Sequence, residues 1–213
     1  MSWLPASPLI RWAVLGAVAL LVLGGLVGAG WAWYSSQEAQ AHQAFAEASD
    51  LVQQAQAPEA TPELRERAGK ALEGVLARHP RASVVPQAAY QLGNLRYAAG
   101  QYAPARGAYE VALAGGATGN LRGLCALGVA YTWENEKSYA KAQAAFEAAL
   151  AGRGPKDFLY EELLVDLARV QELGGNRQAA IETYQRLLKE VPDSRRGDDV
   201  RTRIASLHSA PKP

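Results

Sequence analysis

The chain has 213 residues and carries 22 Lys and Arg against 21 Asp and Glu, a formal net charge of +1. One domain plus an anchor is the natural expectation at this length. The near-neutral balance excludes nucleic-acid binding through a strong overall positive field. A single cysteine, Cys125, excludes an intrachain disulfide framework and any zinc site built from several cysteines.

The first 34 residues differ from the rest, because they contain one charged residue, Arg11, and most of the tryptophans. A helix over the uncharged apolar residues 13–33 is about 31 Å long, close to the thickness of the bilayer's hydrocarbon core. Aromatic residues prefer the headgroup level and flank this run. They are Trp12 at one end and Trp31, Trp33 and Tyr34 at the other. We therefore predict a transmembrane anchor over residues 13–34, after a short cytoplasmic N-terminus over residues 1–12.

A cleaved signal peptide is the alternative to this uncleaved signal anchor. The apolar core of a signal peptide is normally about 7–15 residues long, and the run here is longer and continues through aromatic residues. Arg11 is the only charge before the span, so the positive-inside rule favours a cytoplasmic N-terminus and places residues 35–213 outside.

Small residues recur within the span at four-residue steps. Gly24 and Gly28 form a GxxxG pair, and Gly25 with Ala29 gives a second register. Small residues let membrane helices approach closely, which predicts packing with a second copy or with another membrane protein. The alternative is that glycine is simply common in membrane helices.

The membrane helix is expected to continue into the exported domain. After Tyr34 no helix breaker occurs before Pro58, and apolar residues recur at three- and four-residue steps. A second helix is expected over residues 62–79, with Thr61 as its N-cap and Pro80 as its stop.

Three later stretches share one pattern: a Leu followed by a small residue, a turn, an alanine and an aromatic residue. The alanines are spaced by 37 and 38 residues, and the aromatic residues repeat this spacing. Such self-similarity predicts stacked helix–turn–helix units, because one hairpin cannot bury its apolar face alone. We expect the small residue to admit a close second helix, and the ring to fill the space between hairpins. The small residues are Gly93, Gly128 and Ala168, the alanines Ala105, Ala142 and Ala180, and the rings Tyr109, Phe146 and Tyr184.

This order of residues resembles the tetratricopeptide repeat (TPR), although no unit has the family's first-helix Trp and the second turn, residues 133–138, is expected to hold two extra residues. With the anchor, the resemblance predicts an all-α chain: one transmembrane helix, then an α-solenoid of antiparallel helix pairs over residues 35–208. The expected repeats lie near residues 37–80, 86–119, 121–154 and 161–194, with a capping helix over 198–207 and a tail over 209–213.

The whole layout resembles the ancillary SecYEG translocon subunit family of bacterial inner membranes. The shared features are a short N-terminus, one Gly-rich span ending in Gly-Trp-Ala-Trp-Tyr, a Gln- and Ala-rich helix and repeats of this kind. The resemblance implies a single-pass plasma-membrane protein whose periplasmic domain associates with the translocon and a periplasmic chaperone and helps newly exported proteins. The expected function is a membrane-anchored adaptor for protein–protein interaction. The alternative is a TPR scaffold for another cell-envelope or outer-membrane assembly complex.

No pattern of catalytic or metal-binding residues stands out. His42, His79 and His208 lack the spacing of metal ligands, and Cys125 is expected to be a buried small apolar residue. The Gly-rich stretch 115–119 does not continue into a phosphate-binding GxxxxGK[ST] motif. We therefore expect no enzyme activity, no cofactor and no metal site.

A repeat stack offers instead a concave surface lined by its first helices. Trp133 is of interest there as the only Trp outside the anchor region, although it could equally pack in the enlarged turn. Tyr90 precedes Asn94 where a carboxylate clamp has Lys, so recognition of chaperone C-terminal tails in that manner is not expected. The family's groove-facing positions, mapped onto this chain, predict a partner-binding groove of Gln87, Tyr90, Asn94, Tyr97, Arg122, Trp133, Glu162 and Arg169.

Overall fold

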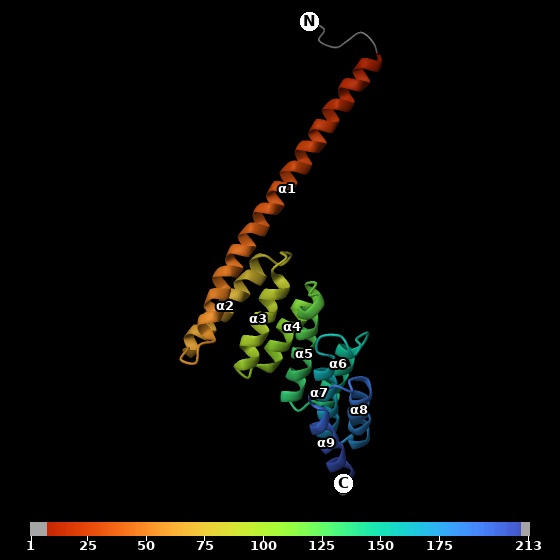
Figure 1. Ribbon diagram of the computed structural model, residues 1–213. Coiled ribbons are helices and arrows are strands. Elements are labelled where there is room, and N and C mark those ends of the chain that lie inside the picture. Colours follow the sequence, from red (N-terminus) through yellow and green to blue (C-terminus); the bar gives the residue numbers. More distant parts are fainter. Residues whose placement is uncertain (1–7, 210–213) are drawn as a thin grey trace.

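The structure, a computed structural model, describes residues 8–209, and in that range every regular element is an α-helix (Figure 1). Of the predicted N-terminus and tail, residues 1–7 and 210–213 lie outside the described part. The helices are α1 (Pro8–Ala55), α2 (Pro62–Arg78), α3 (Val85–Ala98), α4 (Tyr102–Ala114), α5 (Gly119–Asn135), α6 (Tyr139–Leu150), α7 (Tyr160–Leu173), α8 (Arg177–Glu190) and α9 (Gly197–Ser209).

Helix α1 is a single uninterrupted helix of 48 residues. Its first half stands away from the rest of the molecule (Figure 1), and its most apolar stretch has a mean hydropathy of 2.1 with none of it buried. By length and composition this helix can cross a membrane. Its second half buries Ala41, Ala48, Val52 and Ala55 against the domain. The predicted continuation of the apolar helix into the domain is confirmed.

The remaining helices stack as antiparallel pairs into a succession of hairpins, a TPR-like solenoid (Figure 1). Helix α1 packs against α2, α3 against α4, α5 against α6 and α7 against α8, and each hairpin also contacts the next. Helix α9 packs against α8 at the end of the stack. The all-α fold predicted from the repeated pattern is confirmed.

The junction between α1 and the domain is held by polar contacts as well as by apolar packing. Glu38 of α1 accepts a hydrogen bond from the backbone N–H of Ser83, at 2.9 Å, and a second from its hydroxyl. These two bonds lower the pKa of the Glu38 carboxyl. These bonds tie the α2–α3 connection to α1 at Glu38. This position lies four residues, or about 6 Å of helix, beyond Tyr34.

Local signals set the beginning of α2 as predicted. Thr61 has an extended backbone, its Oγ1 accepts a hydrogen bond from the N–H of Leu64 at 3.2 Å, and Pro62 occupies the first helical position. An N-cap oxygen of this kind satisfies one of the backbone donors that have no partner within the helix. The helix ends at Arg78, two residues before Pro80.

The turn of the second later unit is not enlarged, contrary to the prediction. Residues 136–138 form a three-residue turn, as residues 99–101 and 174–176 do, and the two extra residues lengthen the C-terminal part of α5 instead. The short turn persists because Lys137 adopts a left-handed backbone, with φ of 56°, where the other two turns place glycine. Trp133 consequently lies inside α5 rather than in a turn.

One aromatic ring is clamped between two glycines at the contact of the α3–α4 hairpin with α5. A Cβ atom added at Gly93 would lie 2.5 Å from Tyr109 Cε1, and one added at Gly128 would lie 2.6 Å from Tyr109 Cε2. Tyr109 is only 3% exposed. The expectation that small first-helix residues admit the ring between adjacent hairpins is confirmed here.

Candidate functional site

The first helices α3 and α5 enclose a hollow of about 250 Å³. Its walls are mostly aromatic and aliphatic, with one amide side chain. The lining residues are Tyr90, Asn94 and Tyr97 of α3, Tyr109 of α4, and Leu124, Leu127, Gly128 and Tyr131 of α5. The repeat stacking creates this hollow, because Gly93 and Gly128 keep the two first helices free of side chains where the ring of Tyr109 passes between them.

Polar atoms at the floor of the hollow are paired with each other. Tyr109 donates its hydroxyl hydrogen to Asn94 Oδ1 at 2.8 Å, and its ring lies 6.1 Å from that of Tyr90. Burial raises the pKa of Tyr109, so its phenol stays protonated and remains a donor. The floor is therefore fixed and uncharged.

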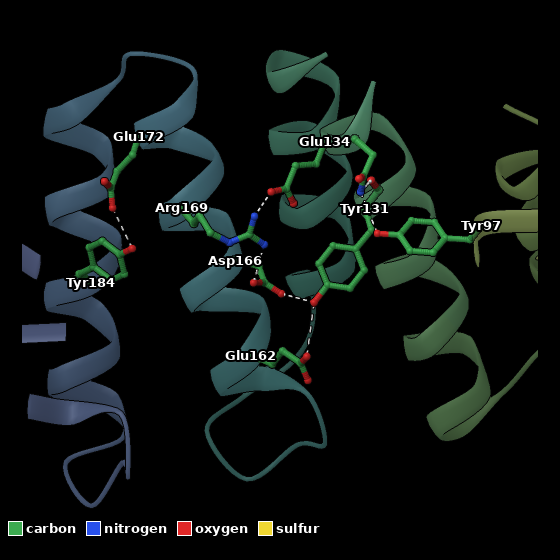
Figure 2. Close-up of polar contacts among 9 residues, drawn as sticks. Tyr97, Tyr131, Glu134, Glu162, Asp166, Arg169, Glu172 and Tyr184 are labelled. Carbon is green, nitrogen blue, oxygen red and sulfur yellow. Dashed lines mark hydrogen bonds and ion pairs between the residues drawn. The ribbon is translucent and has the colours of Figure 1, made fainter. Parts of the chain in front are cut away.

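A second polar contact joins the two first helices at the other end of the hollow. Asn135 of α5 donates its side-chain N–H to the hydroxyl oxygen of Tyr97 at 2.8 Å, and also to the carbonyl of Tyr131 at 2.9 Å. The first of these bonds ties Tyr97 to α5, and the second, within α5, orients the Asn135 side chain (Figure 2).

Tyr131 connects the hollow to a group of carboxylates on α7. Its hydroxyl donates to Asp166 Oδ2 at 2.5 Å and lies 3.4 Å from Glu162 Oε1 (Figure 2). Asp166 is only 7% exposed. Burial raises the pKa of the Asp166 carboxyl and the nearby Glu162 raises it further, while the hydrogen bond from Tyr131 acts in the opposite direction.

Arg169 lies between carboxylates of two helices. It forms an ion pair with Asp166 Oδ1 at 2.8 Å on its own helix and a second with Glu134 of α5 (Figure 2). The guanidinium is thus already engaged on two sides. We call Tyr131, Glu134, Glu162, Asp166 and Arg169 the α5–α7 polar cluster.

Five of the eight predicted groove residues come together in these two places. Tyr90, Asn94 and Tyr97 line the hollow, and Glu162 and Arg169 belong to the α5–α7 polar cluster. Gln87 and Arg122 are exposed on α3 and α5, respectively, and do not line the hollow.

Trp133 is placed apart from the hollow, against the second helices. The guanidinium carbon of Arg106 on α4 lies 3.4 Å from a ring centroid of Trp133, and the Nζ of Lys141 on α6 lies 4.3 Å from it. A cation over an indole face is attracted by the ring's quadrupole. Arg106 is also paired with Glu136 at 2.9 Å, so this Trp has a packing role between adjacent hairpins.

Tyr131, Glu134 and Asp166 are absent from the groove that the sequence predicts. Asp166 had a visible signal, because it is an acid inside the apolar run from Leu163 to Ala168 and must find a partner if that run is buried. The partner itself is 35 residues away in sequence, and no local pattern identifies it.

The residues considered for catalysis or metal binding are the histidines and Cys125. Within residues 8–209, no group of three or more His, Cys, Asp or Glu residues is placed to hold a metal ion. His42 Nε2 lies 3.2 Å from Ser83 Oγ and 3.4 Å from Glu38 Oε1, so the same ring nitrogen faces both groups. In a catalytic triad one ring nitrogen of the histidine contacts the serine and the other contacts the carboxylate. Cys125 is fully buried, and burial raises the pKa of its thiol to about 11, which keeps it unreactive.

The four small residues predicted for membrane-helix packing lie on the exposed part of α1. A Cβ atom added at Gly24, Gly25 or Gly28 would have nothing within 4 Å. Their packing with another helix stays a prediction.

Comparison with known proteins identifies the repeat type. Residues 162–194, which include most of α7 and all of α8, match the tetratricopeptide repeat family. The crystal structure of YrrB, described as a TPR protein with an unusual peptide-binding site, superposes with a TM-score of 0.52 at 16% identity, covering 68% of each chain. TTC0263, described as a thermophilic TPR protein in Thermus thermophilus, gives a TM-score of 0.35 at 20% identity, over 70% of this chain and 92% of that one. No curated protein sequence matches significantly. The likeness to YrrB concerns the fold alone.

Proposed function

We propose that this protein is a membrane-anchored adaptor that binds other proteins in the groove formed by α3, α5 and α7. The observation that carries the proposal is the continuity of α1, which joins an exposed apolar half to a half buried in the solenoid. A rigid helix of this kind holds the groove at a fixed distance from the membrane surface. The hollow and the α5–α7 polar cluster supply the apolar and polar contacts that protein interfaces combine.

The partners proposed are the Sec translocon and a periplasmic chaperone of the bacterial inner membrane. This assignment is supported by the sequence layout, which resembles the ancillary translocon subunit family. The orientation proposed has the N-terminus in the cytoplasm and the solenoid in the periplasm, in accordance with the positive-inside rule for Arg11. Gly24 and Gly28 offer the face through which the span packs with another membrane helix or a second copy.

Co-purification of the full chain from membranes in mild detergent tests the proposal. Quantitative mass spectrometry should enrich translocon subunits and a periplasmic chaperone over an unrelated single-span protein expressed at the same level. The variant Tyr97→Ala should lose the chaperone and retain the translocon, since the groove and the span are separate surfaces. The control is Val111→Ala on the exposed face of the second helix α4, which should retain both.

Failure to enrich either partner would refute the assignment to the translocon. Enrichment of outer-membrane assembly proteins in their place would support the scaffold alternative. The orientation has its own test, in which protease is added outside spheroplasts. Digestion of the solenoid is expected, and protection of residues after 35 would contradict the proposed topology.

A further inference from the structure

We propose that the groove selects a partner segment in which a large apolar side chain is followed within one or two residues by a Lys or Arg. The apolar side chain enters the hollow between α3 and α5, and the cation reaches Glu162. The inference rests on the proposed role of this groove in protein binding and specifies the chemistry of the partner.

The size of the hollow fits one side chain. Its volume of about 250 Å³ is below the range of about 300–1,000 Å³ typical of sites for whole small molecules. Six of its eight lining residues are tyrosine or leucine. The hydroxyls of Tyr109 and Tyr131 are occupied by Asn94 and Asp166, so these rings present mainly their apolar faces to an incoming group. An aromatic or long aliphatic side chain is the complementary occupant.

The charge beside the hollow is negative in excess. The α5–α7 polar cluster contains three carboxylates and one guanidinium, and Arg169 is bonded to two of the carboxylates, Glu134 and Asp166. Glu162 Oε1 lies 3.4 Å from the hydroxyl oxygen of Tyr131, whose one hydrogen is donated to Asp166. Arg196, exposed on the α8–α9 connection, is the other cation whose field acts on Asp166. The uncompensated charge therefore centres on Glu162.

Tyr131 makes the hollow and the carboxylates one continuous site. Its ring lines the hollow, and its hydroxyl touches both Asp166 and Glu162 (Figure 2). In an extended partner segment one or two residues span about 3–7 Å, so a cation just beyond the inserted side chain meets Glu162. A bond between ionised groups is shorter and stronger than one between neutral groups, which makes this position selective.

An acidic segment is disfavoured by the same geometry. A carboxylate bound at Arg169 would lie beside Glu134 and Asp166, which already pair with this guanidinium. Repulsion between these like charges would oppose its binding. Arg169 thus serves to hold α5 and α7 together rather than to receive an acidic tail.

Three fluorescein-labelled hexapeptides test the inference with the full chain in neutral detergent. The probe is Ser-Gly-Phe-Lys-Gly-Ser with an amidated C-terminus, and the comparisons replace Phe by Ala or Lys by Glu. Fluorescence anisotropy should show about tenfold weaker binding for each replacement, the size expected when one buried side chain or one charged hydrogen bond is lost. Equal binding of the three peptides, or no binding of the Phe–Lys peptide at about 1 mM, would overturn the inference.

Two variants locate the binding at this site. Glu162→Gln should weaken binding of the Phe–Lys peptide about tenfold and leave unchanged the binding of a fourth peptide, in which Gln replaces Lys. Leu124→Phe should weaken binding of every Phe-containing peptide, because the larger side chain fills the hollow. The control is Glu110→Gln, which removes the same charge from an exposed position on α4. An effect of Glu162→Gln no larger than that of Glu110→Gln would contradict the inference, with the helical spectrum confirming that each variant is folded.

The two proposals can fail separately. Co-purification of a chaperone or translocon without peptide discrimination would leave the adaptor role standing and remove the partner chemistry. Peptide discrimination without those partners would support the basic–apolar specificity and refute the named partners.

Discussion

Gly128→Ala adds a single methyl group where the ring of Tyr109 passes between two helices. The new Cβ would lie 2.6 Å from Cε2 and 2.7 Å from Cζ of the ring, where ordinary contacts are 3.4–4 Å. The ring has no room to retreat, because its opposite edge packs against Gly93, where an added Cβ would lie only 2.5 Å from Cε1. The helices must therefore move apart.

Overpacking of this kind costs about 1–3 kcal/mol, and replacing a mid-helix glycine by alanine returns up to about 1 kcal/mol. We expect Gly128→Ala to destabilise the solenoid by about 1–2 kcal/mol. Gly107→Ala is the matched control, because Gly107 lies exposed in α4 with nothing within 4 Å of an added Cβ. The Gly107→Ala control should stabilise the solenoid by about 0.5–1 kcal/mol.

Thermal unfolding of the full chain in detergent, followed by the helical circular dichroism signal, measures the difference. At about 2–4 °C per kcal/mol for a domain of this size, the two variants should differ in midpoint by about 3–12 °C. In the background Tyr109→Leu the cost of Gly128→Ala should shrink by at least about 1 kcal/mol, since the clamped ring is gone. Equal midpoints for Gly128→Ala and Gly107→Ala would refute the clamp.

Three further changes test other parts of the structure by the same unfolding assay. Thr61→Ala removes the N-cap of α2 and should lower the free energy of unfolding by about 1 kcal/mol. Thr61→Ser keeps the capping oxygen and should lower it by about 0.3 kcal/mol at most. Equal losses of stability for the two variants would contradict the capping role. Trp133→Leu removes the ring between Arg106 and Lys141 and should destabilise by about 1–3 kcal/mol without changing peptide binding, and a loss of binding instead would place this Trp in the groove. Asp166 has a raised pKa in the folded state, so the stability linked to it is full below the unfolded pKa of about 3.9 and is lost as the pH rises through the folded value. Asp166→Asn removes this pH-dependent loss. The unfolding midpoint of the variant minus that of the unmodified chain should therefore increase between about pH 4 and pH 7. A decrease of this difference over the same interval would show that the carboxylate is stabilised by its partners.

Features encoded over a few neighbouring residues were predictable. The uninterrupted α1 follows from the absence of any helix breaker between Tyr34 and Pro58, and the start of α2 follows from the Thr61–Pro62 pair. The clamp on Tyr109 was also predictable in kind, because a small residue and a ring recurring at a fixed offset must meet when hairpins stack.

Features that depend on the exact path of the chain were not predictable. The second turn keeps its length because Lys137 takes a left-handed backbone, which single-sequence propensity disfavours for a residue other than glycine. The two extra residues then rotate the end of α5 and place Trp133 against the second helices.

The sequence predicted which helices line the candidate groove, but it did not predict which residues contact one another there. The family's groove positions located α3, α5 and α7 and five of the residues that meet there. The bond between Tyr131 and Asp166 joins residues on successive hairpins, and its formation depends on the angle between them. That angle is a property of the whole solenoid, so the acidic character beside the hollow emerges only with the structure.

The central claim is that the groove of a membrane-anchored solenoid binds protein partners, and site-specific photo-crosslinking in living cells tests it most directly. A photoreactive amino acid at Tyr97, which lines the hollow and is partly exposed, should capture a chaperone or a translocon subunit, and the same group at Glu110 on α4 should capture neither. Identical products from both positions, or none from position 97, would contradict the account.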